Sequence, residues 1–383
     1  MPSLLASVLL LLAALPGTAM AAPGDERVRP GEWSKRKVPD GWVVVETDHY
    51  QVQSQVGEAK ARRLADHLEA MLDVYGEILP FRKKLPTFVL KLFDGPASFH
   101  AYNPGARGAA AYYSKSQKEL VAYDSGIILG ERDIPARIRL VPGLDVVLTD
   151  AEVEELAALF ERITDAYLLD LAGVLAHEGW PQYFHYYTVS WVPMPSWLDE
   201  GLGDYFYTAV QEQGAGSDYV LGAVNDYRLR VLQTAFEEGT FARFAELLEF
   251  EQADYYSNAQ VYYAQGWSMV HFLMHHQDEK LRKLIPKLIK DFKDTKNFRR
   301  STDKAFKGRD LDELEREWVG WVLSTEPDDP LRELAERFGT RLLAEDLEAP
   351  SYWRDRYETF ALEVVLENRD EAGSPDRDHD GHR

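Results

Sequence analysis

The chain contains no cysteine among its 383 residues. Disulfides, a thiol nucleophile, a thiolate zinc ligand and a lipid anchor on a leading cysteine are therefore excluded. Any metal ion would have to be held by carboxylates or by some of the 10 histidines. Positive charge is also scarce, because 43 Lys and Arg stand against 64 Asp and Glu, a formal net charge of −21. Nucleic acid and anionic membranes are not expected partners, since both attract basic surfaces.

Long apolar runs are missing as well, apart from one near the N-terminus. Residues 4–15 are apolar, but the run is too short to span a bilayer. A Pro-Gly pair follows at 16–17, and then the small-x-small sequence Ala19-Met20-Ala21. This order indicates a signal peptide over residues 1–21, although the leading region has no Lys or Arg. We expect the mature protein to be soluble and secreted or periplasmic, with no transmembrane segment.

The remaining chain has the composition of a globular protein, with 45% hydrophobic and 12% aromatic residues. Residues 22–40 are rich in Pro, Gly and charge and are expected to form a linker. Residues 41–125 predict a small, strand-rich α+β subdomain. One helix and five strands are expected there: the helix at 58–79, with Leu64, Leu68, Met71, Leu72 and Tyr75 at helical spacing, and strands at 42–45, 50–53, 87–93, 109–114 and 119–123.

Helical periodicity dominates the second half of the chain. Residues 126–345 predict a mostly helical subdomain, with amphipathic helices at 281–292 and 311–323. Residues 346–383 are expected to be a C-terminal extension that ends in a disordered acidic tail. The expected fold class is therefore α+β, a small mixed N-terminal part followed by a mostly helical part.

The segment with the clearest chemical signal is residues 174–182, Val-Leu-Ala-His-Glu-Gly-Trp-Pro-Gln. It begins as the zinc-protease motif H-E-x-x-H begins. In that motif two histidines four residues apart share one helix face and bind zinc, and the Glu polarises the metal-bound water. A further ligand follows downstream, and Glu200, 23 residues after His177 in the sequence Trp-Leu-Asp-Glu-Gly-Leu-Gly-Asp-Tyr, is the candidate.

These motifs resemble those of the gluzincin superfamily of zinc metallopeptidases, and most of all those of a peptidase-MA-like family of secreted bacterial proteins of unknown function. In gluzincins a Glu on the next helix is the third ligand, and the 23-residue offset equals that of the aminopeptidase branch. Residues 261–267, Val-Tyr-Tyr-Ala-Gln-Gly-Trp, resemble a segment of those aminopeptidases whose Tyr stabilises the oxyanion, which places Tyr263 at that position. Residues 47–50, Thr-Asp-His-Tyr, fit as well.

The resemblance covers most of residues 42–325 and implies a thermolysin-like helical subdomain. It implies His177 and Glu200 as metal ligands, and Glu178 and Tyr263 as catalytic residues. It also implies that an edge strand beside the active-site helix pairs with the backbone of a peptide. Residues 119–123 are our candidate for that strand.

The chain departs from the family pattern at the second zinc histidine, where Pro181 stands. Proline has no metal donor, and inside a helix it removes a backbone hydrogen bond and clashes with the carbonyl four residues back, so a kink is expected. His185 is a substitute donor only after a severe kink, because it lies about 12 Å farther along a straight helix at about 1.5 Å per residue. Asp204 is the other candidate substitute.

Simpler roles stand beside the catalytic ones. His177 would then be a hydrogen-bonded relic, Glu178 and Glu200 would pair with cations or cap, and Tyr263 would pack in an aromatic-rich patch. His271 and His275 also have metal spacing, but a position near a helix C-terminus explains them better. Residues 376–381, Asp-Arg-Asp-His-Asp-Gly, open like a calcium loop, but the chain ends before the Glu that such a loop requires.

Three functional classes follow. The first choice is a metallopeptidase-like protein that is catalytically impaired by Pro181 and uses its cleft to bind a peptide or protein, with zinc weakly held or absent. The second is an active zinc-dependent peptidase with a non-standard ligand. The third is a structural, envelope-associated protein. The zinc content of the purified protein, beside that of a Pro181→His variant, separates the first two.

Overall fold

The computed structural model describes residues 28–35, 37–80, 84–106, 109–124, 171–187, 194–211 and 219–328, together with 149–159 apart from 153 and 157, and positions 333 and 337. The chain divides into two compact units, Met1–Asp124 with Ala172–Thr325 and Ser125–Leu171 with Glu326–Arg383. The first unit holds the sheet and the helices of interest. The expected signal peptide and the calcium-loop-like tail lie outside the described residues.

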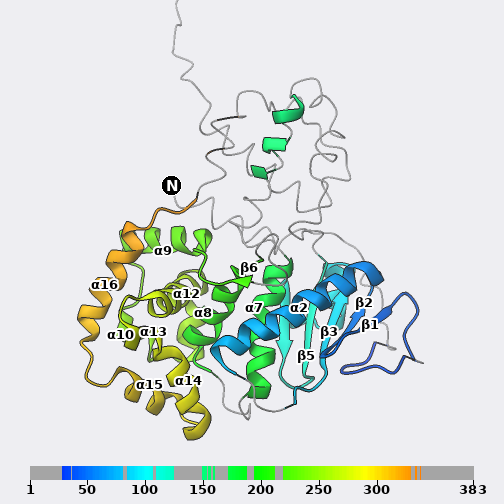
Figure 1. The fold of residues 1–383 in the computed structure, drawn as a ribbon, viewed down its shortest axis with the longest axis horizontal. Coiled ribbons are helices and arrows are strands. Elements are labelled where there is room, and N and C mark those ends of the chain that lie inside the picture. Colours follow the sequence, from blue (N-terminus) through cyan, green and yellow to red (C-terminus); the bar gives the residue numbers. More distant parts are fainter. Residues whose placement is uncertain are drawn as a thin grey trace, which may run out of the picture. The chain divides into compact units, whose positions relative to one another are not determined.

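A five-stranded mixed sheet forms the N-terminal part of the first unit, in the order β1-β2-β3-β5-β4 (Figure 1). The inner strands β2, β3 and β5 run parallel, whereas β1 and β4 are antiparallel to their neighbours. The strands are β1 (Val43–Glu46), β2 (Tyr50–Ser54), β3 (Phe88–Phe93), β4 (Ala111–Ser114) and β5 (Glu119–Tyr123). All five predicted strands are confirmed. The interpretation of Glu119–Tyr123 as the edge strand is wrong, because β5 lies between β3 and β4, and β4 is the edge.

Helix α2 (Glu58–Ile78) lies against the sheet (Figure 1). The five apolar residues predicted from helical spacing are all buried, at 6% exposure or less. Tyr75 from this helix also donates a hydrogen bond of 2.5 Å to the carbonyl of Ala176. That bond ties α2 to α7 (Leu171–Tyr187), the helix that carries the His-Glu-Gly motif.

The opposite face of the sheet is polar but buried. Alternation along the strands places Gln53, Lys91 and Glu119 on this face, and each has no exposed surface. Lys91 Nζ lies 3.3 Å from Glu119 Oε2 and also contacts Gln53 and the carbonyl of Arg29. Glu119 accepts from the Gly31 backbone N–H at 2.9 Å and from the Tyr102 hydroxyl at 2.5 Å. Residues 29–33 therefore cover a buried ion pair, which we call the sheet network (Lys91, Glu119 and these partners).

The second part of the unit is helical. Its longest helices are α7, α9 (Asp226–Glu238), α12 (Ala259–His275) and α16 (Leu311–Ser324), and α8 (Ser196–Tyr207) carries the Glu-Gly motif. Shorter helices of this part are α10 (Phe244–Leu247), α11 (Gln252–Ser257), α13 (Glu279–Arg282), α14 (Leu284–Thr295) and α15 (Phe298–Phe306). Helix α3 (Pro96–Tyr102) instead belongs to the sheet part, between β3 and β4. A two-stranded sheet pairs β6 (Val210–Gln211) with β7 (Tyr219–Val220). The helix predicted at 281–292 is thus two helices, which Lys283 separates, whereas the helix predicted at 311–323 is confirmed.

Helices α8 and α12 are in close contact because each has a glycine at the crossing. A Cβ at Gly201 would lie 2.5 Å from the carbonyl oxygen of Gly266, and a Cβ at Gly266 would lie 2.7 Å from the carbonyl oxygen of Trp197. Any larger residue at either position would push the backbones apart. Glu200 on α8 and Tyr263 on α12 are held near each other by this contact.

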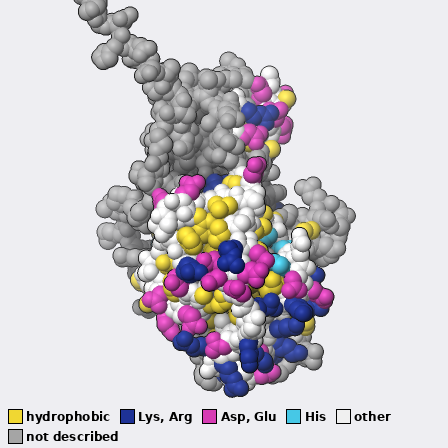
Figure 2. Space-filling view, turned by 90° about the vertical axis from the view of Figure 1, so that its left-hand side faces the viewer, with side chains coloured by type: hydrophobic (Ala, Val, Ile, Leu, Met, Phe, Trp, Pro, Cys, Tyr) yellow, Lys and Arg dark blue, Asp and Glu magenta, His cyan; other side chains and the backbone are white. Residues whose placement is uncertain are grey.

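The expected mixed fold, with an N-terminal sheet followed by helices, is confirmed. No helix among the described residues is long and apolar enough to cross a membrane. The Lys and Arg side chains visible on one face gather towards its lower end (Figure 2). Helices α14 and α15, which are rich in Lys and Arg, lie at that end in Figure 1.

Candidate functional site

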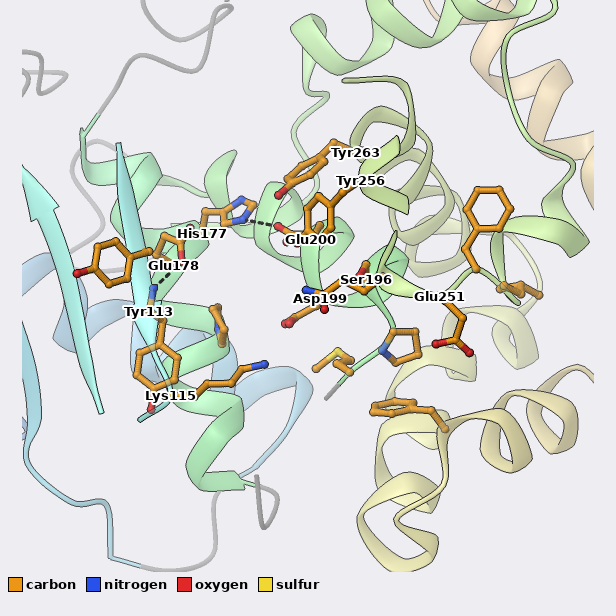
Figure 3. Close-up of a pocket in the computed structure, with 18 of the residues that line it drawn as sticks. Tyr113, Lys115, His177, Glu178, Ser196, Asp199, Glu200, Glu251, Tyr256 and Tyr263 are labelled. Carbon is orange, nitrogen blue, oxygen red and sulfur yellow. Dashed lines mark hydrogen bonds and ion pairs between the residues drawn. The ribbon is translucent and has the colours of Figure 1, made fainter. Parts of the chain in front are cut away.

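A cavity of about 520 Å³ opens where β4, α7 and α8 meet residues 248–252, α11, α12 and α15. The sequence motifs supply His177, Glu178, Glu200 and Tyr263 to its lining. Figure 3 shows their side chains converging from three helices beside the edge strand. Four candidate residues from distant parts of the chain therefore lie together in one cavity. Pro181 lines the cavity too.

Both ring nitrogens of His177 face carboxylates. Nε2 lies 3.2 Å from Glu200 Oε2, and Nδ1 lies 3.1 Å from Asp204 Oδ1. Burial by itself lowers the pKa of His177, but the hydrogen bonds to Asp204 and Glu200 outweigh burial and raise the pKa well above its ordinary value. The imidazole is therefore charged at neutral pH and donates from both nitrogens. Gly203 makes room for the ring, since a Cβ there would lie 2.6 Å from it.

Asp204 is held between His177 and Arg228. Its side chain is only 2% exposed, and its Oδ2 lies 2.7 Å from the Nε of Arg228. Burial raises the pKa of Asp204, but the charges of Arg228 and His177 outweigh burial and hold the pKa below its ordinary value. Arg228 is positioned at the start of α9, where the Asn225 side chain accepts from its backbone N–H at 3.0 Å. The cleft network is thus a line of alternating charges, Arg228, Asp204, His177 and Glu200.

Glu178 points to the edge strand rather than to His177. Its Oε2 accepts a hydrogen bond of 3.1 Å from the backbone N–H of Tyr113 on β4. Burial raises the pKa of Glu178 to about 7, the charge of His177 opposes this rise, and the charge of Glu200 adds to it. Glu178 therefore titrates near neutrality and marks the place where β4 meets α7.

Two tyrosines complete the wall around Glu200. The Tyr256 hydroxyl donates to Glu200 Oε1. The ring of Tyr263 lies 6.1 Å from the ring of Tyr256 and 5.0 Å from the guanidinium of Arg228, measured from ring centroids. Burial and the nearby charge of Glu200 raise the pKa of Tyr263, so its hydroxyl stays protonated. Tyr263 is thus both a cavity residue and a packing partner of an aromatic cluster.

Asp199 and Lys115 face each other across the cavity (Figure 3). Burial raises the pKa of Asp199 to about 7, repulsion from Glu200 adds to the rise, and Lys115 opposes it. The Oδ1 of Asp199 is buried and has no hydrogen-bond partner among the described residues. Asp199 and Lys115, both of which the structure describes, do not approach within the 4 Å of an ion pair.

The residues present do not fit the zinc ion that the motif implies. Pro181 offers no donor at the second ligand position, and α7 continues through it to Tyr187. His177 directs Nε2 towards Glu200 and Nδ1 towards Asp204, so His177 and Glu200 together offer only two donors on the Nε2 side of the ring. Asp204 lies at Nδ1 and Glu200 at Nε2, on opposite sides of the ring. Among the described residues, no three His, Asp or Glu side chains are grouped to hold a metal ion.

The substitute donor His185 is not among the residues that line the cavity. Its ring packs against Tyr113 with 5.6 Å between centroids. His271 and His275 belong to another cluster, in which the His275 Nε2 lies 3.0 Å from the Tyr205 hydroxyl and the His271 Nε2 lies 3.0 Å from the carbonyl of Gly222. Both pKa values are lowered by burial, that of His271 to about 4. These two histidines are neutral packing residues.

Sequence reasoning missed four cavity or network residues: Tyr113, Asp199, Arg228 and Tyr256. Asp199 stands beside Glu200 in the motif, so it was accessible to sequence reasoning as a neighbouring carboxylate. Arg228 had no signal, because nothing in the sequence around it marks a partner for Asp204, 24 residues earlier. Tyr113 contributes its backbone, which no residue pattern reveals.

Residues 173–292 match a protein family described as "Protein of unknown function (DUF1570)". The chain is similar to this family over that segment. The matched segment contains His177, Glu200, Arg228 and Tyr263, and it excludes the sheet. No curated protein and no solved structure matches the chain. The similarity therefore covers the helices of the cleft network and assigns them no activity.

Proposed function

We propose that this protein is a metallopeptidase-like binding protein that works outside the cytoplasm and holds an extended peptide, or an extended segment of a protein, in its cleft without cutting it. The proposal includes a relationship to the gluzincins, with α7, α8 and α12 in a thermolysin-like arrangement. The observation that supports it most is the position of β4. Among the described strands it is an edge of the sheet, and it lines the cavity along the side that faces α7.

The register of β4 shows which of its backbone groups face the cavity. The Tyr113 N–H points away from β5, because it donates to Glu178 instead. In an antiparallel pair the outward and inward groups alternate, so Ala111 faces the same side as Tyr113. A peptide strand laid beside β4 would pair with these groups, and its carbonyl would compete with Glu178 for the Tyr113 N–H.

The absence of cleavage follows from the cleft network. Each ring nitrogen of His177 lies beside a carboxylate, that of Asp204 or that of Glu200. In this proposal the positive charge between these carboxylates is the His177 imidazolium and not a metal ion. Glu178 then has no metal-bound water to polarise. The retained Glu178, Glu200 and Tyr263 serve as lining of the binding cleft.

The second candidate, an active zinc-dependent peptidase with a non-standard ligand, has one observation in its favour. Glu178, Glu200 and Tyr263, which the resemblance gives catalytic or ligand roles, all line the same cavity. Zinc content decides between the candidates. We expect purified wild-type protein to contain no stoichiometric zinc by elemental analysis, and stoichiometric zinc that is lost in His177→Ala would establish the second candidate.

Binding along β4 is tested by removing one backbone donor. Fluorescently labelled, blocked eight-residue peptides from an alanine-based library would be titrated against full-length mature protein by fluorescence anisotropy. We expect Tyr113→Pro to weaken binding about tenfold relative to Tyr113→Ala, because only the proline removes the outward N–H, and one hydrogen bond in a dry site accounts for a change of this size.

A proline at the other edge of the sheet is the matched control. Val44 on β1 also has its N–H directed away from its partner strand, since the Thr47–Tyr50 pair at the hairpin sets the alternation. Val44→Pro should leave peptide binding unchanged. Equal affinities for Tyr113→Pro and Tyr113→Ala would contradict binding along β4, and no measurable binding by wild type would contradict the proposed function as a whole.

A further inference from the structure

The cavity beside β4 is rich in carboxylates. Three cationic residues line it, Lys115, His177 and Arg299. Five acidic residues line it as well: Glu178, Asp199, Glu200, Glu249 and Glu251. His177 is engaged by Glu200 and Asp204, and Arg299 forms an ion pair with Glu249. Two of the three cations are therefore neutralised by their own partners.

Asp199 differs from three of the other four carboxylates, which each have a partner in the chain. Glu178 accepts from Tyr113, Glu200 accepts from Tyr256, and Glu249 pairs with Arg299. The Asp199 Oδ1 is buried with no hydrogen-bond partner among the described residues. Native structures pair nearly all buried polar atoms, so an unpaired carboxylate oxygen beside a cavity indicates a partner that arrives from outside the chain.

The direction of the side chain supports this inference. Asp199 is on α8, one residue before Glu200, where it lines the cavity, and its carboxylate points towards the side on which Lys115 lies (Figure 3). Lys115 follows directly after β4, so a peptide paired with β4 would pass between Lys115 and Asp199. A side chain of that peptide would point at α8.

We propose that Asp199 recognises a cationic side chain, lysine or arginine, of the peptide that lies along β4. The ligand cation would donate hydrogen bonds to the unpaired carboxylate, and the surrounding negative charge would disfavour an acidic side chain at the same place. The inference rests on the proposed function, because it assigns the chemical class of the ligand that the cleft holds.

The test compares peptides that differ in one side chain. Acetylated and amidated eight-residue alanine-based peptides would carry a single lysine, norleucine or glutamate, moved through the sequence, and be titrated against the full chain. We expect the lysine peptide to bind about tenfold more tightly than the norleucine peptide at one position, the size expected for a hydrogen bond to a charged group, and the glutamate peptide to bind most weakly.

Asp199→Asn should bring the lysine and norleucine affinities within about twofold of each other, while the norleucine affinity stays as in wild type. Asp199→Glu, which keeps the charge, should restore part of the preference. Asp73→Asn on α2 is the matched control, since it removes one exposed carboxylate outside the cavity and should leave the preference intact. A lysine preference that survives in Asp199→Asn would overturn the inference.

Two further arms keep the inference separate from the proposed function. A norleucine peptide with a free N-terminus tells whether the cation is a terminal ammonium instead of a side chain, and a tenfold gain there that Asp199→Asn abolishes would overturn the side-chain assignment. If no peptide binds, the proposed function fails, and N-acetyl-lysine methylamide decides the inference. This compound should raise the melting temperature of wild type more than that of Asp199→Asn. Equal increases in the two proteins would overturn the inference.

Discussion

Two networks of buried charge in the first unit, the sheet network and the cleft network, differ in what surrounds them. The sheet network around Lys91 and Glu119 has no exposed side chain in its central pair. The cleft network of Arg228, Asp204, His177 and Glu200 is equally connected, but the two members that line the cavity are partly exposed, His177 at 14% and Glu200 at 17%. One network is sealed by residues 29–33, and the other ends at a cavity.

The difference teaches how burial of charge separates structure from function. In the sheet network each carboxylate oxygen of Glu119 has a donor, so the network is complete without a ligand. Beside the cleft network, Asp199 keeps an unpaired oxygen. Buried ion pairs contribute little net stability over apolar replacements, but losing one partner is costly. The predictions below test whether the two networks respond as this contrast requires.

The largest expected effect comes from Asp204→Ala. This change leaves Arg228 and His177, both charged and largely buried, without their shared counter-charge. Loss of one partner from such a group costs about 3–5 kcal/mol in the free energy of unfolding. Chemical denaturation followed by tryptophan fluorescence measures it. Asp312→Asn is the control, since the Asp312 side chain is 70% exposed in its pair with Arg243 and should cost less than about 1 kcal/mol.

Lys91→Met should cost less, about 2–3 kcal/mol, because Glu119 keeps its hydrogen bonds from Gly31 and Tyr102. The double variant Lys91→Met with Glu119→Leu should recover only part of the loss, because it removes the unpaired charge of Glu119 but leaves the Gly31 N–H and the Tyr102 hydroxyl without an acceptor. Denaturation of the three variants gives the comparison. A double variant that is no more stable than Lys91→Met would show that the sheet network requires its charges.

The two networks should respond in opposite directions to rising pH. Burial lowers the pKa of Lys91 to about 8, although Glu119 opposes the shift. The unfolded chain then binds more protons than the folded one between about pH 8 and 10.4, so the Lys91 contribution to stability rises over that window, by at most about 1.4 kcal/mol per pH unit. Between about pH 8 and 10.4 the free energy of unfolding of wild type should therefore change with a more positive slope against pH than that of Lys91→Met.

His177 has the opposite sign because its pKa is raised in the folded state. Its contribution is fully present below the unfolded value of about 6.5 and is lost as the pH rises towards the folded pKa. The free energy of unfolding of wild type should therefore fall more steeply above pH 6.5 than that of His177→Gln. Parallel curves for the two proteins would mean that His177 is not charged in the folded protein.

The smallest effects should come from the tyrosines that donate to each network. Tyr102→Phe removes a donor from the fully buried Glu119 and should cost about 1–2 kcal/mol. Tyr256→Phe removes a donor from Glu200 at the cavity, and Tyr256 is 41% exposed. Water can replace that donor, so the cost should stay below about 0.5 kcal/mol. Thermal melting of the matched pair would show whether the difference has this order.

The elements with local signals were predicted well from the sequence. The hairpin of β1 and β2, the apolar face of α2 and the helix α16 follow from periodicities that depend only on neighbouring residues. The order of strands does not follow, because β5 was assigned to the edge although β4 occupies it. Strand order is set by which strands pair across the chain, and periodicity carries no such information.

The candidate site divides in the same way. His177, Glu178, Glu200 and Tyr263 were identified by motif and lie in one cavity. Arg228 was not found, although it sets the charge state of Asp204, because its role depends on the approach of α9 to α8. Likewise, residues 29–33 have the composition of a linker, but their backbone covers Lys91 and Glu119. In both cases tertiary contacts decide the role of residues whose local sequence is uninformative.

An edge strand that accepts a ligand is also a place where identical chains can join and aggregate. Strand β4 has features that restrict this. It has only four residues, Lys115 follows it, and the Glu178 carboxylate occupies the Tyr113 N–H from the same chain. A second β4 would have to displace Glu178 and bring two Lys115 side chains close together. The edge can thus stay open to a short extended segment while the protein resists pairing with copies of itself.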